Sequence, residues 1–238
     1  MNRDSIFSIA HFLNSSHEVK HIQLNYQGSL LSSPCKPNDP YYNSYPQYLD
    51  IIKAPEMWNL MYCTPHERNC HPTVAVIDNG LDISHPDLGT GSDAYENIYK
   101  HPGETAWSIA TNPNSGNGID DDNNGYIDDW KGWDFTSDGM FATGEDNDVK
   151  YDNWGILTND LYQHGTKVAG IIAAKTNNGI GIAGIAGGWT NLPGAQILAI
   201  NLDDGGYIKE SVVDDAIDYA RKNGAKVINL SISLPFYN

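Results

Sequence analysis

The sequence predicts an α/β fold built on a mostly parallel sheet. Three runs have the apolar, β-branched composition of strands buried on both faces: TVAVID (73–78), AQILAINLD (195–203) and AKVINLSIS (225–233). The segment between the last two, SVVDDAIDYARKNG, carries an apolar stripe at helical spacing and ends at Gly224, a residue type that commonly stops a helix. Strand, helix, strand in this order is a crossover unit, which joins parallel strands.

Signals for helices support the same fold class. The run HGTKVAGIIAAK (164–175) predicts a helix that is buried rather than amphipathic, because nearly every residue after the first turn is small or apolar. Ser211 followed by Asp214 resembles a capping box and predicts a helix start at Ser211. Before the first strand we expect a short helical segment interrupted by Pro55.

Length and charge exclude several classes of partner. The chain has 238 residues, which suits one domain and a small appendage, and 40% of them are hydrophobic. Its 14 Lys and Arg against 30 Asp and Glu give a net charge of -16. Binding to nucleic acid or to an anionic membrane requires clustered basic residues, so neither partner is expected. No apolar run approaches the length of a bilayer span.

The composition divides the chain in two. Residues 1–34 combine a helix-like apolar run with a roughly alternating stretch that is typical of a strand, and the turn-rich SSPCKPNDP follows as a linker. The first residues do not form a convincing signal peptide, because the apolar run is short and His11 breaks it. The pattern of strands and helices described above belongs to residues 35–238.

The three cysteines leave their pairing open. Cys63 and Cys70 bracket a short polar loop, so a local disulfide between them is one option, and it leaves Cys35 unpaired. There is no C-x-x-C motif, so a zinc site is not expected. The cysteines permit an oxidising compartment without requiring one.

A strongly acidic segment follows the first strand. Between Asn117 and Asp160 there are twelve Asp and Glu and two Lys. This is either a solvated loop or a binding site for a hard cation. Positions 1, 3, 5 and 9 of an EF-hand-like loop match Asp120, Asp122, Asn124 and Asp128. Position 12 is Lys131 instead of the usual Glu, and Asp129 is a substitute ligand in this interpretation.

Two residues suggest chemistry by their positions. Asp78 directly follows a buried strand, at the sheet edge where open α/β proteins bind ligands, and Asn79-Gly80 supplies a tight turn. His164 opens the buried helix. Taken singly, Asp78 is also a common turn or cap residue, and His164 is explained equally well as a structural histidine.

Together these motifs resemble a known family. TVAVIDNGLDISHPDL and HGTKVAGIIAAKTNNGIGIAGIAG are similar to the Asp and His motifs of the subtilisin-like serine proteases (subtilases, peptidase family S8). AKVINLSIS resembles the strand beside their specificity pocket, and PNDPYYNSYPQYLDIIKAPEMW resembles the start of the mature enzyme. The resemblance implies a three-layer fold with helices on both faces of the sheet.

The resemblance also implies the domain organisation. Residues 35–238 resemble the N-terminal part of a catalytic domain, incomplete at the C-terminus. Residues 1–34 resemble the C-terminal half of an inhibitory propeptide, a short α+β remnant.

The resemblance further implies a catalytic triad of Asp, His and Ser. Asp78 would orient the imidazole, and His164 would act as general base and then general acid. No serine after His164 lies in a Gly-rich turn like that of the family nucleophile. We therefore expect a fragment without the nucleophile, which does not hydrolyse peptides by itself. A secreted monomer is implied, whose partners are a peptide or protein substrate and its own propeptide.

Two segments match the walls of the family's substrate cleft. Gly205, Gly206 and Tyr207 follow the second predicted strand, and a plain turn is the alternative explanation of the two glycines. Leu230, Ser231 and Ile232 match the opposite wall. Such edges bind an extended peptide as an added strand.

The family's strong calcium site has counterparts here. The side chains of Asp39, Asp87 and Asn178 and the carbonyls of Thr176, Ile180 and Ile182 would supply the oxygen ligands that Ca²⁺ prefers. The alternative is a loop stabilised by asparagine side chains alone.

Departures from the family pattern leave room for a second function. Gln163 replaces the usual Gly before the histidine, Lys167 replaces a common His, and the last strand ends in SIS rather than Ser-x-Gly. The alternative is a calcium-stabilised pseudoprotease that binds peptides without cleaving them. A nucleotide-binding module is not expected, since VIDNGLDISHP lacks a G-x-G-x-x-G turn.

Overall fold

The computed structural model describes residues 35–44, 47–62, 71–88, 97–105, 116–136, 144–150, 163–203, 208 and 210–232. All of them belong to one compact unit, Cys35–Asn238. The expected propeptide remnant, residues 1–34, lies outside the described residues. Within the described ranges, no helix combines the length and the apolar character needed to cross a bilayer.

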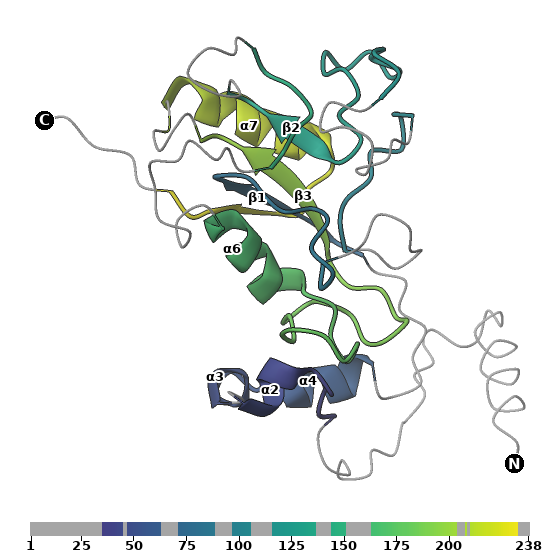
Figure 1. Cartoon of the computed structure of the whole chain (residues 1–238), viewed down its shortest axis with the longest axis vertical. Helices are drawn as coiled ribbons and strands as arrows, with labels where there is room; N and C mark the ends of the chain where they lie inside the picture. Colours follow the sequence, from purple (N-terminus) through teal and green to yellow (C-terminus); the bar gives the residue numbers. More distant parts are fainter. Residues whose placement is uncertain are drawn as a thin grey trace, which may run out of the picture. The chain divides into compact units, whose positions relative to one another are not determined.

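The centre of the fold is a four-stranded parallel sheet (Figure 1). Its strands are β1 (Thr73–Asp78), β2 (Gly132–Asp134), β3 (Gln196–Asn201) and β4 (Val227–Leu230), in the order β2-β3-β1-β4. The parallel sheet predicted from the sequence is therefore confirmed. Strand β2 was not expected, because its three residues, GWD, lie in the acidic segment and are too few to show a strand pattern.

Two helices cover opposite faces of this sheet (Figure 1). They are α6 (His164–Ala173) and α7 (Glu210–Lys222). Alternate residues of β1 pack toward different helices, since successive side chains of a strand point to opposite faces. The cluster on the α6 side includes Val74, Val76, Ala169 and Ala173. The cluster on the α7 side includes Ala75, Ile77, Ala216 and Tyr219. All six residues of β1 are buried, as predicted for a central strand.

The two ends of α7 test the helix start and the helix stop that the sequence predicts. The helix begins at Glu210, so Ser211 lies inside it and the predicted cap at Ser211 is wrong. Gly224 has φ +77° and donates its N–H to the Arg221 carbonyl at 3.1 Å, which terminates the helix as predicted.

Within the described residues, three short helices precede the sheet and form a satellite core. They are α2 (Pro40–Ser44), α3 (Gln47–Ile51) and α4 (Ala54–Met61). Pro55 lies in the first turn of α4, where its missing N–H costs no helical hydrogen bond, so it starts a helix and does not interrupt one. Trp58 is buried among these helices and donates its indole N–H to the Ile185 carbonyl at 2.9 Å, which ties them to the loop after α6.

Cys35 is disulfide-bonded, whereas the option of a local Cys63–Cys70 pair would have left it unpaired. Cys63 and Cys70 themselves lie outside the described residues.

Candidate active site

The structure brings Asp78 and His164 into direct contact. Asp78 is the last residue of β1 and His164 is the first residue of α6. The imidazole Nδ1 lies 2.8 Å from Asp78 Oδ1 and 3.0 Å from Oδ2. The carboxylate is nearly inaccessible, with 4% of its side chain exposed, while the imidazole is 45% exposed. A buried acid therefore holds a histidine whose ring reaches solvent.

The turn after β1 fixes the start of α6 against the strand. The Gly165 N–H donates to Asn79 Oδ1 at 3.0 Å, so the Asn79 side chain satisfies an N–H that the helix leaves free. The Asp82 N–H donates to Thr166 Oγ1 at 2.9 Å. Gly80 has φ +89°, a conformation that glycine adopts without strain. The sequence indicated a turn at Asn79-Gly80 but gave no sign that Asn79 also holds the helix.

This geometry sets the proton positions on the imidazole. An ionised carboxylate only accepts hydrogen bonds, so Asp78 selects the tautomer with the proton on Nδ1. Nε2 is then unprotonated in the neutral ring and able to take a proton from another group. The same carboxylate stabilises the imidazolium once that proton has been taken.

Backbone N–H groups hold Asp78 in place at the end of β1. The Leu202 N–H donates to the Asp78 carbonyl at 2.9 Å, and the Asn79 N–H donates to Asp78 Oδ1 at 2.8 Å. Asn201 is fully buried beside Asp78 in the β1–β3 register and donates to Asp134 Oδ2 at 2.7 Å. The ends of β1, β2 and β3 are thus joined by polar contacts that the sequence pattern did not indicate.

One expected wall of the substrate cleft lies at the same sheet edge. Leu230 pairs with Ile77 in the β1–β4 register, so Leu230 to Ile232 run past the end of β1 that carries Asp78. Leu230 is 39% exposed, and Ser231 Oγ accepts a hydrogen bond from Asn229 Nδ2 at 2.9 Å. The other expected wall, Gly205, Gly206 and Tyr207, lies outside the described residues.

Asp39 and Asp87 meet at the loop after α6. Both carboxylates are buried, and burial raises the pKa of each above its usual value. Asp39 Oδ2 accepts the Asn177 N–H at 2.7 Å, whereas Asp39 Oδ1 has no hydrogen-bond partner. Asp87 accepts hydrogen bonds from Asn178 Nδ2 at 3.0 Å and from the Ile182 N–H at 2.8 Å. The charge of Asp87 further raises the pKa of Asp39, so the two acids repel each other.

The remaining groups of this predicted calcium site are placed unevenly. Asn178 lies against Asp87, and its Oδ1 accepts the Ile180 N–H at 2.9 Å. The Thr176 carbonyl accepts the Thr190 N–H at 2.9 Å, so one of its two lone pairs is already used. One buried carboxylate oxygen has no partner here, and all the candidate ligands are oxygen atoms. This is the ligand type that a hard cation prefers.

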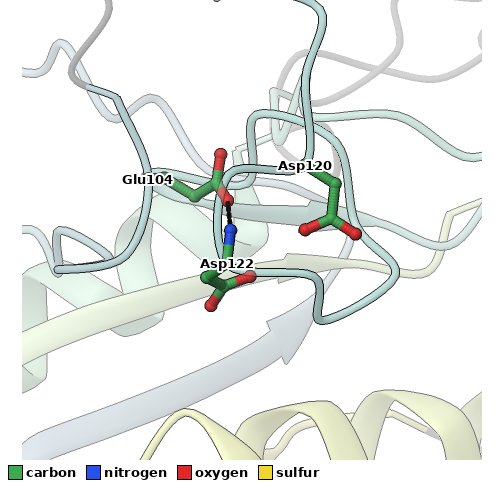
Figure 2. A group of neighbouring side chains, drawn as sticks. All are labelled: Glu104, Asp120 and Asp122. Atoms are coloured by element: carbon green, nitrogen blue, oxygen red, sulfur yellow. Dashed lines mark hydrogen bonds between the residues drawn. The ribbon is translucent and has the colours of Figure 1, made fainter.

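The acidic loop is arranged differently from an EF-hand. Asp120 and Asp122 each offer an oxygen to a common point, and the third member of this group is Glu104, which the sequence did not indicate (Figure 2). Asp128 accepts the N–H groups of Asn117 and Gly118, both at 2.8 Å, and is not in the group.

The Asn124 side chain is also engaged in other hydrogen bonds. Its Nδ2 donates to Asp129 at 3.2 Å, and its Oδ1 accepts the Tyr126 N–H at 2.7 Å. Of the three aspartates that the EF-hand-like spacing suggested, the structure therefore brings two, Asp120 and Asp122, into this group.

Comparison with known proteins identifies the family. The model of the subtilase family matches residues 70–235. The chain is 32% identical over 229 residues to the thermophilic serine proteinase of Bacillus sp. (strain AK1), which covers 96% of this chain and 40% of that protein. It is 31% identical over 197 residues to thermitase of Thermoactinomyces vulgaris, covering 82% of this chain and 47% of thermitase. It is 33% identical over 165 residues to subtilisin-like protease 1 of Plasmodium berghei (strain Anka), and the alignment covers 69% of this chain and 22% of that protein.

The chain thus spans less than half the length of these curated relatives. The matched region contains all four strands of the sheet and the Asp78–His164 pair. The family match over most of the chain agrees with the parallel sheet and with the motifs around residues 78 and 164. This chain belongs to the subtilase family.

Proposed function

We propose that the chain provides the acid and the base of a serine endopeptidase. The contact between the buried Asp78 carboxylate and His164 Nδ1 carries this proposal. In the proposed reaction, Nε2 removes the proton from a serine hydroxyl as the oxygen attacks a peptide carbonyl, and the imidazolium then protonates the leaving amine. Asp78 holds the ring in the required tautomer throughout. The proteinases named above support a peptide or protein as the substrate.

The nucleophile is not assigned to any of the 238 residues. The described serine at the sheet edge, Ser231, accepts a hydrogen bond from Asn229 and lies on the proposed substrate wall. We propose that this chain alone does not cleave peptides, since a hydroxyl that the base can deprotonate is indispensable to this mechanism. If no serine nucleophile is available to His164, the chain would bind peptides without cleaving them.

A serine-directed probe tests the enzymatic role. A fluorescent phosphonate should label a form of the protein that carries the serine nucleophile and should leave the 238-residue chain unlabelled. A matched His164→Ala variant of that form should lose the label, because the serine is then not activated. If the serine-carrying form is folded and stays unlabelled, the pseudoprotease alternative replaces the enzyme.

We propose that substrate binds along β4 as an added strand. β4 is at the edge of the described sheet, and its residues Val227, Ile228 and Leu230 are between 37% and 55% exposed. Main-chain groups of an edge strand are available to an extended peptide. Register places Leu230 to Ile232 next to the end of β1, so a peptide bound there would pass near Asp78 and His164.

We also propose that Asp39 and Asp87 hold a structural Ca²⁺ ion. The side chain of Asn178 and the carbonyls of Ile180 and Ile182 would complete the site. The ion would neutralise two buried acids that repel each other and would pair the free oxygen of Asp39. The loop 176–182 would then be linked to the start of α2. A disulfide at Cys35 suits an oxidising, extracellular location, which we propose for this protein.

Removing calcium should lower the thermal stability of the wild-type chain. At a calcium concentration about a hundredfold above Kd, binding to the folded state contributes about 2.7 kcal/mol, or roughly 5–10 °C in Tm. Asp39→Asn should abolish most of this difference between calcium and EDTA, whereas Asp214→Asn on the exposed face of α7 removes the same charge and should keep it. Differential scanning fluorimetry measures both. An unchanged calcium response in Asp39→Asn would contradict the assignment.

A further inference from the structure

A row of three buried polar side chains crosses the sheet at the edge that carries the Asp–His pair. Asp78 pairs with Asn201 in the β1–β3 register, and Asn201 pairs with Asp134 in the β2–β3 register. Asp134 and Asn201 are fully buried, and Asp78 is 3% exposed. Burying a polar group is costly unless it is hydrogen-bonded, so the partners of the central amide indicate its role.

The side chains of this row leave the same face of the sheet. Val76 and Ala199, two residues earlier in β1 and β3, both pack in the cluster on the α6 side. Trp133, one residue before Asp134, packs in the cluster on the α7 side. Because side chains alternate along a strand, the whole row points to the α6 side, the side of His164. Neighbouring strands are about 4.8 Å apart, so a neutral amide separates two acidic residues whose backbones are about 10 Å apart.

The Asn201 side chain uses both its donors and its acceptor. Its Nδ2 donates to Asp134 Oδ2 at 2.7 Å and to the Lys150 carbonyl at 3.2 Å. Its Oδ1 accepts the Asp203 N–H at 3.0 Å. Asp134 is fixed in turn, because its Oδ1 accepts the N–H and the hydroxyl of Thr136, both at 2.7 Å. The amide therefore links β3 to β2 and to the segment that ends at Lys150, and this requires a side chain that both donates and accepts.

These hydrogen bonds hold the peptide group that supports Asp78. The Leu202 N–H donates to the Asp78 carbonyl at 2.9 Å. Asn201 precedes Leu202 and Asp203 follows it, and the Asn201 side chain bonds the Asp203 N–H. The Asp203 carbonyl accepts the Thr136 hydroxyl at 3.0 Å. Leu202 thus lies between two fixed residues, which gives its N–H a defined position for the bond to Asp78.

From these contacts we propose that Asn201 is a positioning residue for the Asp78–His164 pair. Its amide fixes Leu202, Leu202 fixes the end of β1, and the Asp78 carboxylate there holds the imidazole Nδ1 at 2.8 Å. A carboxylate at position 201 could not donate to Asp134 and would add a third buried charge to the row. This inference rests on the proposed function, since it gives Asn201 a part in the same reaction.

Asn201→Leu tests this role, because leucine has a similar size and forms no side-chain hydrogen bonds. In a form of the protein that carries the serine, kcat should fall at least tenfold, since a small displacement of the catalytic pair is costly. In the 238-residue chain, proton NMR observes the His164 Nδ1 proton through its bond to the Asp78 carboxylate. This resonance should shift or broaden, and the Leu202 N–H should exchange with solvent at least tenfold faster.

Asn97→Leu is the matched control. Asn97 is 1% exposed, and its Nδ2 donates to the carbonyls of Ala173 at 2.7 Å and Gly187 at 2.9 Å, at the other end of α6. This variant should also lower the urea midpoint, yet it should keep kcat within about threefold and leave the imidazole proton unchanged. An equal loss of kcat in both variants, or an unchanged imidazole proton in Asn201→Leu, would overturn the proposal.

Exchanging the two side chains gives a second test that also serves if Asn201→Leu folds poorly. Asn201→Asp alone should lower the urea midpoint and disturb the imidazole proton, because two buried carboxylates then face each other. Adding Asp134→Asn restores a donor and an acceptor in reversed order, and it should recover both signals. No recovery in the double variant would contradict the proposal. If wild type with a serine is inactive while the NMR results hold, the proposed function fails and the link from Asn201 to the Asp78–His164 contact stands.

Discussion

Asp78→Asn should lower kcat by about 10⁴-fold in a form of the protein that carries the serine. Asp78 Oδ1 accepts the Asn79 N–H at 2.8 Å, and in the variant the amide oxygen would keep this contact. The amide NH₂ would then occupy the position of Oδ2, which lies 3.0 Å from His164 Nδ1. Because an NH₂ group donates, Nδ1 would become the acceptor and the ring proton would move to Nε2. A protonated Nε2 is not a base, so the hydroxyl would not be activated.

Kinetics and NMR check this result separately. The measurement is kcat on a peptide substrate, and Asp82→Asn serves as the control because it removes a nearby charge whose described partners lie in Ser84. The control should stay within about threefold of wild type. Nitrogen-15 NMR of the imidazole reports the tautomer in the 238-residue chain, with or without a serine. A loss below tenfold in kcat, or an unchanged tautomer, would show that Asp78 does not orient His164.

Gly165→Ala should destabilise the fold and displace His164. A Cβ at Gly165 would lie 2.2 Å from the Gly80 carbonyl oxygen and 3.1 Å from Asp78 Cβ. The carbonyl belongs to a backbone turn and has little room to move, so α6 would have to shift away from β1. We expect a loss of about 3 kcal/mol in the free energy of unfolding. Since His164 is the preceding residue, a shift near 1 Å should cost a further ~10²-fold in kcat.

Gly170 in the same helix offers a matched comparison. A Cβ there would meet only Ile182 Cδ1 at 3.4 Å, an ordinary contact. Gly170→Ala should therefore leave kcat unchanged and raise stability by up to about 1 kcal/mol, because alanine favours helix over glycine. Urea unfolding of both variants gives the comparison. If Gly165→Ala is as stable as Gly170→Ala, close packing of α6 on the turn after β1 does not fix the site.

Local patterns were sufficient for the elements that carry the Asp–His pair. β1 is a continuous apolar run and α6 is rich in small residues. Each of these patterns is contained within a dozen consecutive residues. The parallel arrangement followed from the strand–helix–strand order alone. Predicted and observed bounds agree for β1 and differ by up to a few residues elsewhere, as for 195–203 against Gln196–Asn201. β2 had no such pattern, because it pairs with β3 through only three residues.

Contacts between side chains of distant segments could not be predicted from local sequence patterns. The EF-hand-like spacing suggested Asp128, but two N–H groups at the start of the loop use that carboxylate. Glu104 lies 16 positions before Asp120 in a stretch without any motif, and only the folded chain brings them together. Cys35 is disulfide-bonded, although one option from the sequence left it unpaired.

The sequence by itself determined the strands β1, β3 and β4, the buried helix and the two residues at the ends of β1 and α6, because hydrophobic periodicity and turn residues act over a few positions. The tertiary structure alone decided that Asn79 holds α6, that Glu104 joins Asp120 and Asp122, and that Cys35 is bonded. Those contacts depend on the direction in which each side chain leaves the backbone after packing, and a linear pattern does not contain that direction.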